Sequence, residues 1–96
     1  MAKIYKYKIG PNEKSEIKDR ILNILKIDWQ GEDLCAWCLV SEDCPESRIR
    51  FVIIPTGYPF KLKKNLKYID TVQDGPFVWH IFYELVEQSG GDRNVN

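Results

Sequence analysis

Short runs of β-branched and aromatic residues, separated by turn-forming residues, recur at intervals of about 8–12 positions along this chain. The separators at residues 31–33, 56–59 and 73–75 each contain glycine, which allows a sharp change of chain direction. Runs of this length are typical of strands and are shorter than most helices. We therefore expect a mainly β fold: a single small antiparallel sheet, twisted or shaped as an open barrel, of about six short strands.

The expected strands follow from residue type and from the positions of the turns. They cover residues 3–9, 24–29, 35–40, 48–54, 66–72 and 76–83. Asp74-Gly75, between the last two runs, is a hairpin signal. Residues 13–27 are ambiguous, because their isoleucines fall at helical spacing while the run that starts near residue 24 resembles a strand. We expect one short helix or an irregular segment before that strand.

The length of 96 residues is typical of one domain. An apolar content of 44% argues against a disordered chain. We expect a single β-rich domain over residues 1–89, followed by a disordered tail over residues 90–96, where glycine and polar residues predominate.

Several features of the sequence bear on its cellular location. No apolar run approaches the roughly 18 residues that a membrane span requires, and the lysine-rich first ten residues differ from a signal peptide. Three cysteines is an odd number, which favours reduced thiols over a disulfide framework. Basic and acidic side chains are equal in number, 14 of each, so no overall field attracts DNA or membranes. We therefore expect a cytoplasmic protein without membrane binding or nonspecific DNA binding.

The C-A-W-C sequence at residues 35–38 invites a metal or redox interpretation. Residues three apart in a strand point to opposite faces, so the two thiols would diverge. Only Cys44 and His80 remain as further soft ligands for a zinc ion, which requires four ligands. We expect the cysteines to pack as small apolar residues, with no metal site and no cofactor.

His80, the only histidine, lies in the most apolar run of the chain, residues 77–83. In a strand, the odd-numbered residues of this run share one face and the even-numbered residues, including His80, share the other. Both faces are apolar, so we expect a central strand that is buried on both sides. A lone histidine there is expected to be hydrogen-bonded and structural. No recognisable nucleophile and base accompany it, and we expect no enzymatic activity.

Charge is distributed unevenly between two neighbouring stretches. Residues 31–47 contain five acidic and no basic side chains, whereas residues 48–68 contain six basic and no acidic ones. The basic stretch also carries four aromatic residues. Cations that pair with phosphate, beside rings that stack on a base, are typical of a nucleotide site. Alternatively, residues 35–40 and 48–54 pair as a hairpin, and the opposite charges merely face each other.

The turn at residues 56–59 lies within the basic stretch. Its glycine can bring backbone N–H groups close to a ligand, although a plain turn requires no ligand. Together with the lysines that follow, it forms the expected mouth of a binding site. The candidate ligand-binding residues are Arg48, Arg50, Thr56, Gly57, Tyr58, Lys61, Lys63, Lys64, Trp79 and His80.

Four segments, in this order and spacing, carry a resemblance to a known family: residues 4–7, 35–40, 56–59 and 68–82. The last segment is the most specific of them. Over about residues 3–83, the chain resembles a family of small uncharacterised proteins common in tailed phages and prophages, for which no activity is established. The resemblance implies a viral setting and a host cytoplasm, and no particular reaction.

These observations favour binding over catalysis. The first hypothesis is a phage-encoded host-takeover or anti-defence protein that sequesters a small anionic ligand such as a nucleotide signal. The second is an inhibitor that binds a host protein through an edge strand or an apolar face. The third is a minor structural protein of the phage particle. An exposed sheet edge or face would also favour a homo-oligomer, whose subunit number the sequence leaves open.

Overall fold

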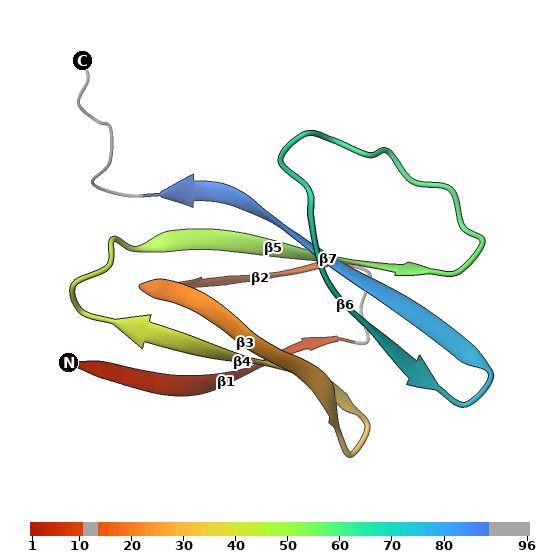
Figure 1. The fold of residues 1–96 in the computed structure, drawn as a ribbon, viewed down its shortest axis with the longest axis horizontal. Helices are drawn as coiled ribbons and strands as arrows, with labels where there is room; N and C mark the ends of the chain where they lie inside the picture. Colours follow the sequence, from red (N-terminus) through yellow and green to blue (C-terminus); the bar gives the residue numbers. More distant parts are fainter. Residues whose placement is uncertain (11–13, 89–96) are drawn as a thin grey trace.

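The computed structural model describes residues 1–10 and 14–88, which form strands and the connections between them (Figure 1). The described residues contain no helix, and therefore none that could cross a membrane. The expected tail over residues 90–96 lies outside the described part of the chain. The strands, in chain order, are β1 (Ala2–Gly10), β2 (Lys14–Asp19), β3 (Ile21–Gln30), β4 (Asp33–Ser41), β5 (Ser47–Pro55), β6 (Lys67–Asp74) and β7 (Phe77–Gln88).

The strands form two sheets in which all neighbouring strands are antiparallel. One sheet has three strands in the order β1-β4-β3, and the other has four in the order β2-β5-β7-β6. The mainly β, antiparallel fold expected from the sequence is confirmed. In detail, the described residues hold seven strands in two sheets that are not closed into a barrel, where about six strands in one sheet were expected.

The first part of β3 explains why residues 13–27 resembled a helix. Ile21 and Ile24 pack against the core, and Ile27 is buried within it. These residues are three apart, whereas residues on one face of a regular strand are two apart. The pairing of β3 with β4 shifts between Ile21 and Asn23 and again between Ile24 and Lys26. Each such bulge adds a residue to the strand, so a spacing of three keeps the same face inward. The expected helical turn is therefore replaced by β2 and β3.

The hydrophobic core lies between the two sheets. Leu34, Ala36 and Cys38 of β4 face it from the three-stranded sheet, because alternate residues of a strand share a face. Phe51 and its alternate neighbours on β5 face it from the four-stranded sheet. Burial of apolar surface from both sheets provides the main stabilisation.

The two thiols of residues 35–38 diverge, as expected for a strand. Cys38 is fully buried in the core, whereas Cys35 lies on the opposite face of β4, where it is also buried. Burial, together with a smaller effect of the Asp19 carboxylate, raises the pKa of the Cys38 thiol to about 11. All three cysteines are free. Among the described residues, no three His, Cys, Asp or Glu side chains lie close enough together to hold a metal ion.

Strand β7 is central in its sheet, between β5 and β6. Ile81 is fully buried in the core, and Trp79 and Tyr83 pack against the same core. His80 and Phe82 point to the outer face, where they are only half-buried. The central position and the alternation agree with the expectation from the sequence. The expected burial on both sides is not found, because His80 and Phe82 remain half-buried on the outer face, where Phe60 of the connection between β5 and β6 packs against Phe82.

Candidate ligand-binding site on the outer face of the four-stranded sheet

The connection between β5 and β6, which we call the 56–66 segment, forms the large loop of Figure 1. It begins beside β7, where the backbone N–H of Thr56 donates to the carbonyl of Val78 at 3.1 Å. Farther along, the ring of Phe60 lies 5.4 Å from the ring of Phe82 on the outer face of β7. The segment therefore covers part of the face that carries His80.

A tight turn opens this segment, at the position that the sequence indicated. The N–H of Tyr58 donates to the carbonyl of Pro55 at 3.2 Å. Gly57, between them, has φ of 91°, a value that side chains disfavour. The open space around Gly57 would admit a Cβ atom, so only the backbone conformation favours glycine here. The turn directs the Tyr58 side chain outward, where 67% of the residue is exposed.

Both ring nitrogens of His80 have hydroxyl partners. Nε2 lies 2.7 Å from Oγ1 of Thr56, and Nδ1 lies 3.1 Å from Oγ1 of Thr71. The Thr71 hydroxyl lies in turn 2.7 Å from the hydroxyl of Tyr68. Each hydroxyl can donate or accept, so either neutral tautomer of the ring fits this arrangement. The resulting hydrogen-bonded chain, Thr56–His80–Thr71–Tyr68, fixes the imidazole, so the hydrogen bonding expected for His80 is present.

A shallow hollow of about 190 Å³, which we call the aromatic hollow, lies over these hydrogen-bonded side chains. Its rings provide flat apolar surfaces, and its floor exposes the polar atoms of Thr56 and His80. Such a combination suits a planar ring with hydrogen-bonding groups on its edge. The hollow is lined by Ile54, Pro55, Thr56, Gly57, Tyr58, Phe60, Tyr68, His80 and Phe82.

A second hollow of about 280 Å³, the basic hollow, adjoins the first, because Phe60 lines both. At its floor, Glu84 is only 4% exposed. Lys63 Nζ lies 3.0 Å from one oxygen of Glu84, and Arg50 Nη1 donates to the other at 3.1 Å. These contacts hold the pKa of the Glu84 carboxyl below its usual range, and the contact with Lys63 has the larger effect. The hollow is lined by Arg50, Val52, Phe60, Lys61, Lys63, Leu66 and Glu84.

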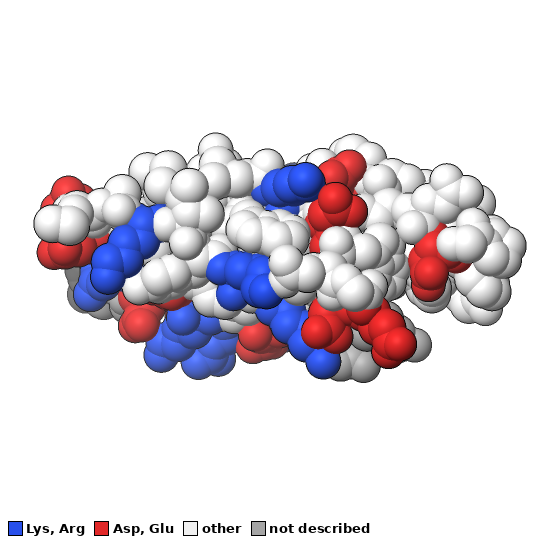
Figure 2. Space-filling model, turned by 90° about the horizontal axis from the view of Figure 1, so that it is seen from below, with Lys and Arg blue, Asp and Glu red and all other residues white. Residues whose placement is uncertain are grey.

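Acidic side chains partly neutralise the basic stretch of the sequence, but they do not come from a hairpin partner strand. Strands β4 and β5 lie in different sheets, so residues 35–40 and 48–54 do not pair. Arg48 lies instead 3.4 Å from Glu87 of β7, and Arg50 donates to Glu16 of β2 at 2.9 Å. Lys61 has no ion pair with any described residue. Basic and acidic groups are likewise interspersed on the face shown in Figure 2.

The structure brings together seven of the ten candidate residues. Thr56, Gly57, Tyr58 and His80 line the aromatic hollow, and Arg50, Lys61 and Lys63 line the basic hollow.

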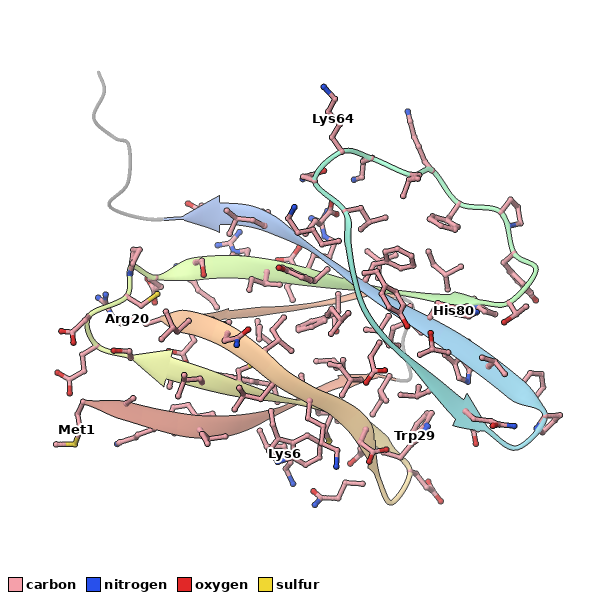
Figure 3. The ribbon with its side chains drawn as sticks, viewed as in Figure 1. Met1, Lys6, Arg20, Trp29, Lys64 and His80 are labelled. Carbon is pink, nitrogen blue, oxygen red and sulfur yellow. The ribbon has the colours of Figure 1, made fainter. Side chains whose placement is uncertain are left out.

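The other three candidates lie elsewhere. Arg48 is paired with glutamates outside the hollows, and the Lys64 side chain points away from the body of the molecule (Figure 3). Trp79 faces the core, because neighbours of His80 in a strand point to the opposite face. Its Nε1 is buried without a hydrogen-bond partner among the described residues. Trp79 therefore cannot stack on a ligand in the aromatic hollow.

The ten candidates leave out Phe60, which lines both hollows, and they also leave out Thr71 and Glu84. Thr71 lies opposite His80 in the β6–β7 pairing, and counting outward from the Asp74-Gly75 hairpin signal would have found it. Glu84 shares a face with His80 and Phe82, but nothing in the sequence showed that two cations from other segments would surround it. Only the fold shows that Glu84 lies between Lys63 and Arg50.

Comparison with known proteins gives a family without an assigned role. Residues 1–91 match the family described as Domain of unknown function (DUF7352). No curated protein and no solved structure matches the chain.

Proposed function

The chain belongs to the family described as Domain of unknown function (DUF7352), and from its site we propose a non-enzymatic binding protein for a small anionic, nucleotide-like ligand. The resemblance to phage and prophage proteins supports a setting in the host cytoplasm. There, sequestration of a nucleotide signal would serve host takeover or anti-defence. The ligand occupies the aromatic and basic hollows together.

The observation that carries this proposal is the position of Phe60, which lines both hollows. A nucleotide has two corresponding parts, a flat ring and an anionic group, which the ribose joins over a short distance. Tyr58 offers an exposed ring for stacking, which contributes about 1–3 kcal/mol per base. Lys61, which has no ion pair among the described residues, offers a charge to phosphate in the neighbouring hollow.

Glu84 limits how strongly the basic hollow attracts an anion. Its carboxylate already engages Lys63 and Arg50, and Glu16 engages Arg50 as well. A phosphate would therefore share these cations instead of meeting them free. We expect ring stacking to contribute more to affinity than charge, and a nucleotide to bind more tightly than inorganic phosphate.

Isothermal titration with a panel of cyclic and linear nucleotides tests the proposal, with adenosine and inorganic phosphate as the separate parts. Tyr58→Ala should weaken nucleotide binding about five- to hundredfold, the equivalent of one lost stacking contact. Tyr5→Ala, at an exposed tyrosine of the other sheet, is the matched control and should bind as the wild type does. Absence of heat across the whole panel would remove the proposal.

Binding of a host protein is the second candidate, and exposed apolar side chains of the same segment favour it. Tyr58, Phe60 and Leu62 are all exposed on the 56–66 segment, and exposed apolar groups that gather on one segment are typical of interaction surfaces. Native mass spectrometry of the protein from infected cells separates the two candidates. A retained nucleotide supports the first, and a stoichiometric protein partner that Leu62→Asp releases supports the second.

A further inference from the structure

A cleft larger than either hollow lies at the side of the molecule where the two sheets meet, and it shares Tyr68 with the aromatic hollow. It has a volume of about 620 Å³ and lies between the first part of β3 and the first part of β6, with the end of β7 behind them. We call it the intersheet cleft. Its volume is within the range of small-molecule sites, about 300–1,000 Å³.

The two strands that border the cleft are joined at their far ends. There, Trp29 Nε1 of β3 donates to the carbonyl of Gln73 of β6 at 3.1 Å, and Figure 3 shows Trp29 beside the end of β6. At the near ends, both strands carry bulges: two in β3, at residues 21–26, and one in β6, at residues 68–70. Bulges bend a strand and interrupt regular pairing. The cleft opens where these bulges lie.

The bulges also bear on what the cleft can bind. An added strand, from a second copy or another protein, requires a regular row of free N–H and C=O groups along the edge. The pairing of β3 with β4 is interrupted twice and that of β6 with β7 once, so bulges bend both of the edge strands that border the cleft. The geometry therefore favours a small ligand over an added strand.

Half of the residues that line the cleft are aliphatic, and the rings of two tyrosines add to this apolar surface. Ile49 at its floor is buried, whereas Leu22, Tyr68 and Leu85 remain exposed at its rim by 60%, 57% and 47%. Large apolar side chains around a cleft are suited to a hydrocarbon chain, because each buried methylene contributes to binding.

The described residues that line the cleft carry charge of one sign. Among the described residues that line it, Lys67 is the only charged one, and its ammonium group has no ion pair with a described residue. The remaining polar lining consists of two asparagines, one serine and two tyrosines. A ligand with an anionic end would meet a free cation and no carboxylate.

We propose that the intersheet cleft binds a single-chain amphipathic carboxylate of the fatty-acid class. The hydrocarbon chain lies against Ile49 and the apolar rim, and the carboxylate pairs with Lys67. This site is distinct from the hollows on the outer face, and among the described residues Tyr68 alone lines both the intersheet cleft and the aromatic hollow. Its test does not depend on the nucleotide proposal, and Tyr68 is left unchanged in it.

Isothermal titration below the micellar concentration tests the site, with dodecanoate, dodecanol and dodecyltrimethylammonium as probes. Dodecanoate should bind most tightly, dodecanol more weakly, and the cation least. From octanoate to decanoate to dodecanoate, affinity should rise by up to about fourfold per methylene, until the chain outgrows the cleft.

Lys67→Gln should weaken dodecanoate binding about two- to fivefold, and leave dodecanol binding unchanged. Leu85→Glu places a carboxylate at the rim and should abolish dodecanoate binding. Lys61→Gln, in the basic hollow, is the matched control and should bind dodecanoate as the wild type does. A thermal melt confirms that each variant is folded.

Two results would overturn the inference. In the first, all three probes bind equally, and neither Lys67→Gln nor Leu85→Glu changes this binding. That result would mean adsorption without a site. The other is a dimer in sedimentation that Leu85→Glu dissociates, with no dodecanoate bound, which would mean that a second copy covers the cleft.

Discussion

Lys63 Nζ lies 3.0 Å from Glu84 Oε1, so an ion pair joins the 56–66 segment to the outer face of β7. The carboxylate is buried and the lysine is half-exposed. Arg50, from the neighbouring strand β5, donates to the second carboxylate oxygen. Glu84 therefore fixes the segment that carries Tyr58 and Phe60, and it also competes with any anion for two cations of the basic hollow.

Glu84→Gln should therefore change stability and ligand binding in opposite directions. Loss of the buried negative charge leaves Lys63 without its partner and Arg50 with Glu16 alone, and we expect the free energy of unfolding to fall by about 1.5–3 kcal/mol. The same change frees Lys63 for phosphate and leaves Arg50 with one carboxylate partner instead of two, so nucleotide affinity should rise. Urea unfolding and titration measure the two effects. Glu87→Gln, at an exposed partner of Arg48, is the control and should change both very little.

The stabilisation by Glu84 should also depend on pH. Lys63 and Arg50 hold the pKa of this carboxyl below its unfolded value, so the folded state releases its proton at lower pH than the unfolded state does. The contribution is then complete above the unfolded pKa, about 4.3, and is lost as the pH falls through the folded pKa. The difference in unfolding free energy between wild type and Glu84→Gln should therefore shrink below about pH 4.3. A difference that stays constant down to pH 2 would contradict this assignment.

Gly57 gives a prediction about the backbone alone. A residue with a side chain at φ of 91° is strained, and no neighbouring atom would contact the added Cβ. Gly57→Ala should cost about 1–2 kcal/mol in unfolding free energy. Gly57→Asn should cost less, because asparagine tolerates positive φ better. If both variants unfold like the wild type, the turn is not held in this conformation.

Much of the fold could be predicted from residue types, and the exceptions have physical causes. The alternation of residues 77–83 predicted correctly that His80 and Ile81 face opposite sides of the sheet, because a strand in a sheet has a strict period of two. The same rule failed for β3, where bulges change the period to three. Residues 13–27 therefore resembled a helix, since a spacing of three also occurs in helices.

The site was predictable only where its residues are close in the sequence or lie opposite each other in a hairpin. The turn at Gly57 and the basic residues after it belong to one segment. Strand neighbours that are far apart in the sequence were not predictable, and this affected the charges most. Glu16 and Glu84 reach Arg50 because β2 and β7 flank β5, an arrangement that composition does not encode.

The cysteines should differ in reactivity according to burial. Cys38 is fully buried, and with a pKa of about 11 roughly one thiol in a thousand is ionised at pH 8. Cys44 is half-buried, with its Sγ 3.3 Å from the carbonyl of Ile21. Iodoacetamide at pH 8, followed by mass spectrometry, should modify Cys44 first. Cys38 should be modified only as fast as the protein unfolds in urea. Equal modification rates of Cys38 and Cys44 without urea would show that the core opens.

The chain Thr56–His80–Thr71–Tyr68 predicts coupling between two hydroxyls that do not touch. Thr71→Val removes the partner of His80 Nδ1 and of the Tyr68 hydroxyl, and should cost about 0.5–1.5 kcal/mol in unfolding free energy. Thr71→Ser keeps the hydroxyl and should cost less. Thr56→Val removes the partner of Nε2. Because both changes act on one imidazole, the double variant should deviate from additivity by about 0.5 kcal/mol or more. Simple addition of the two losses would mean that the ring does not connect the hydroxyls, and the floor of the aromatic hollow would then not be fixed by His80.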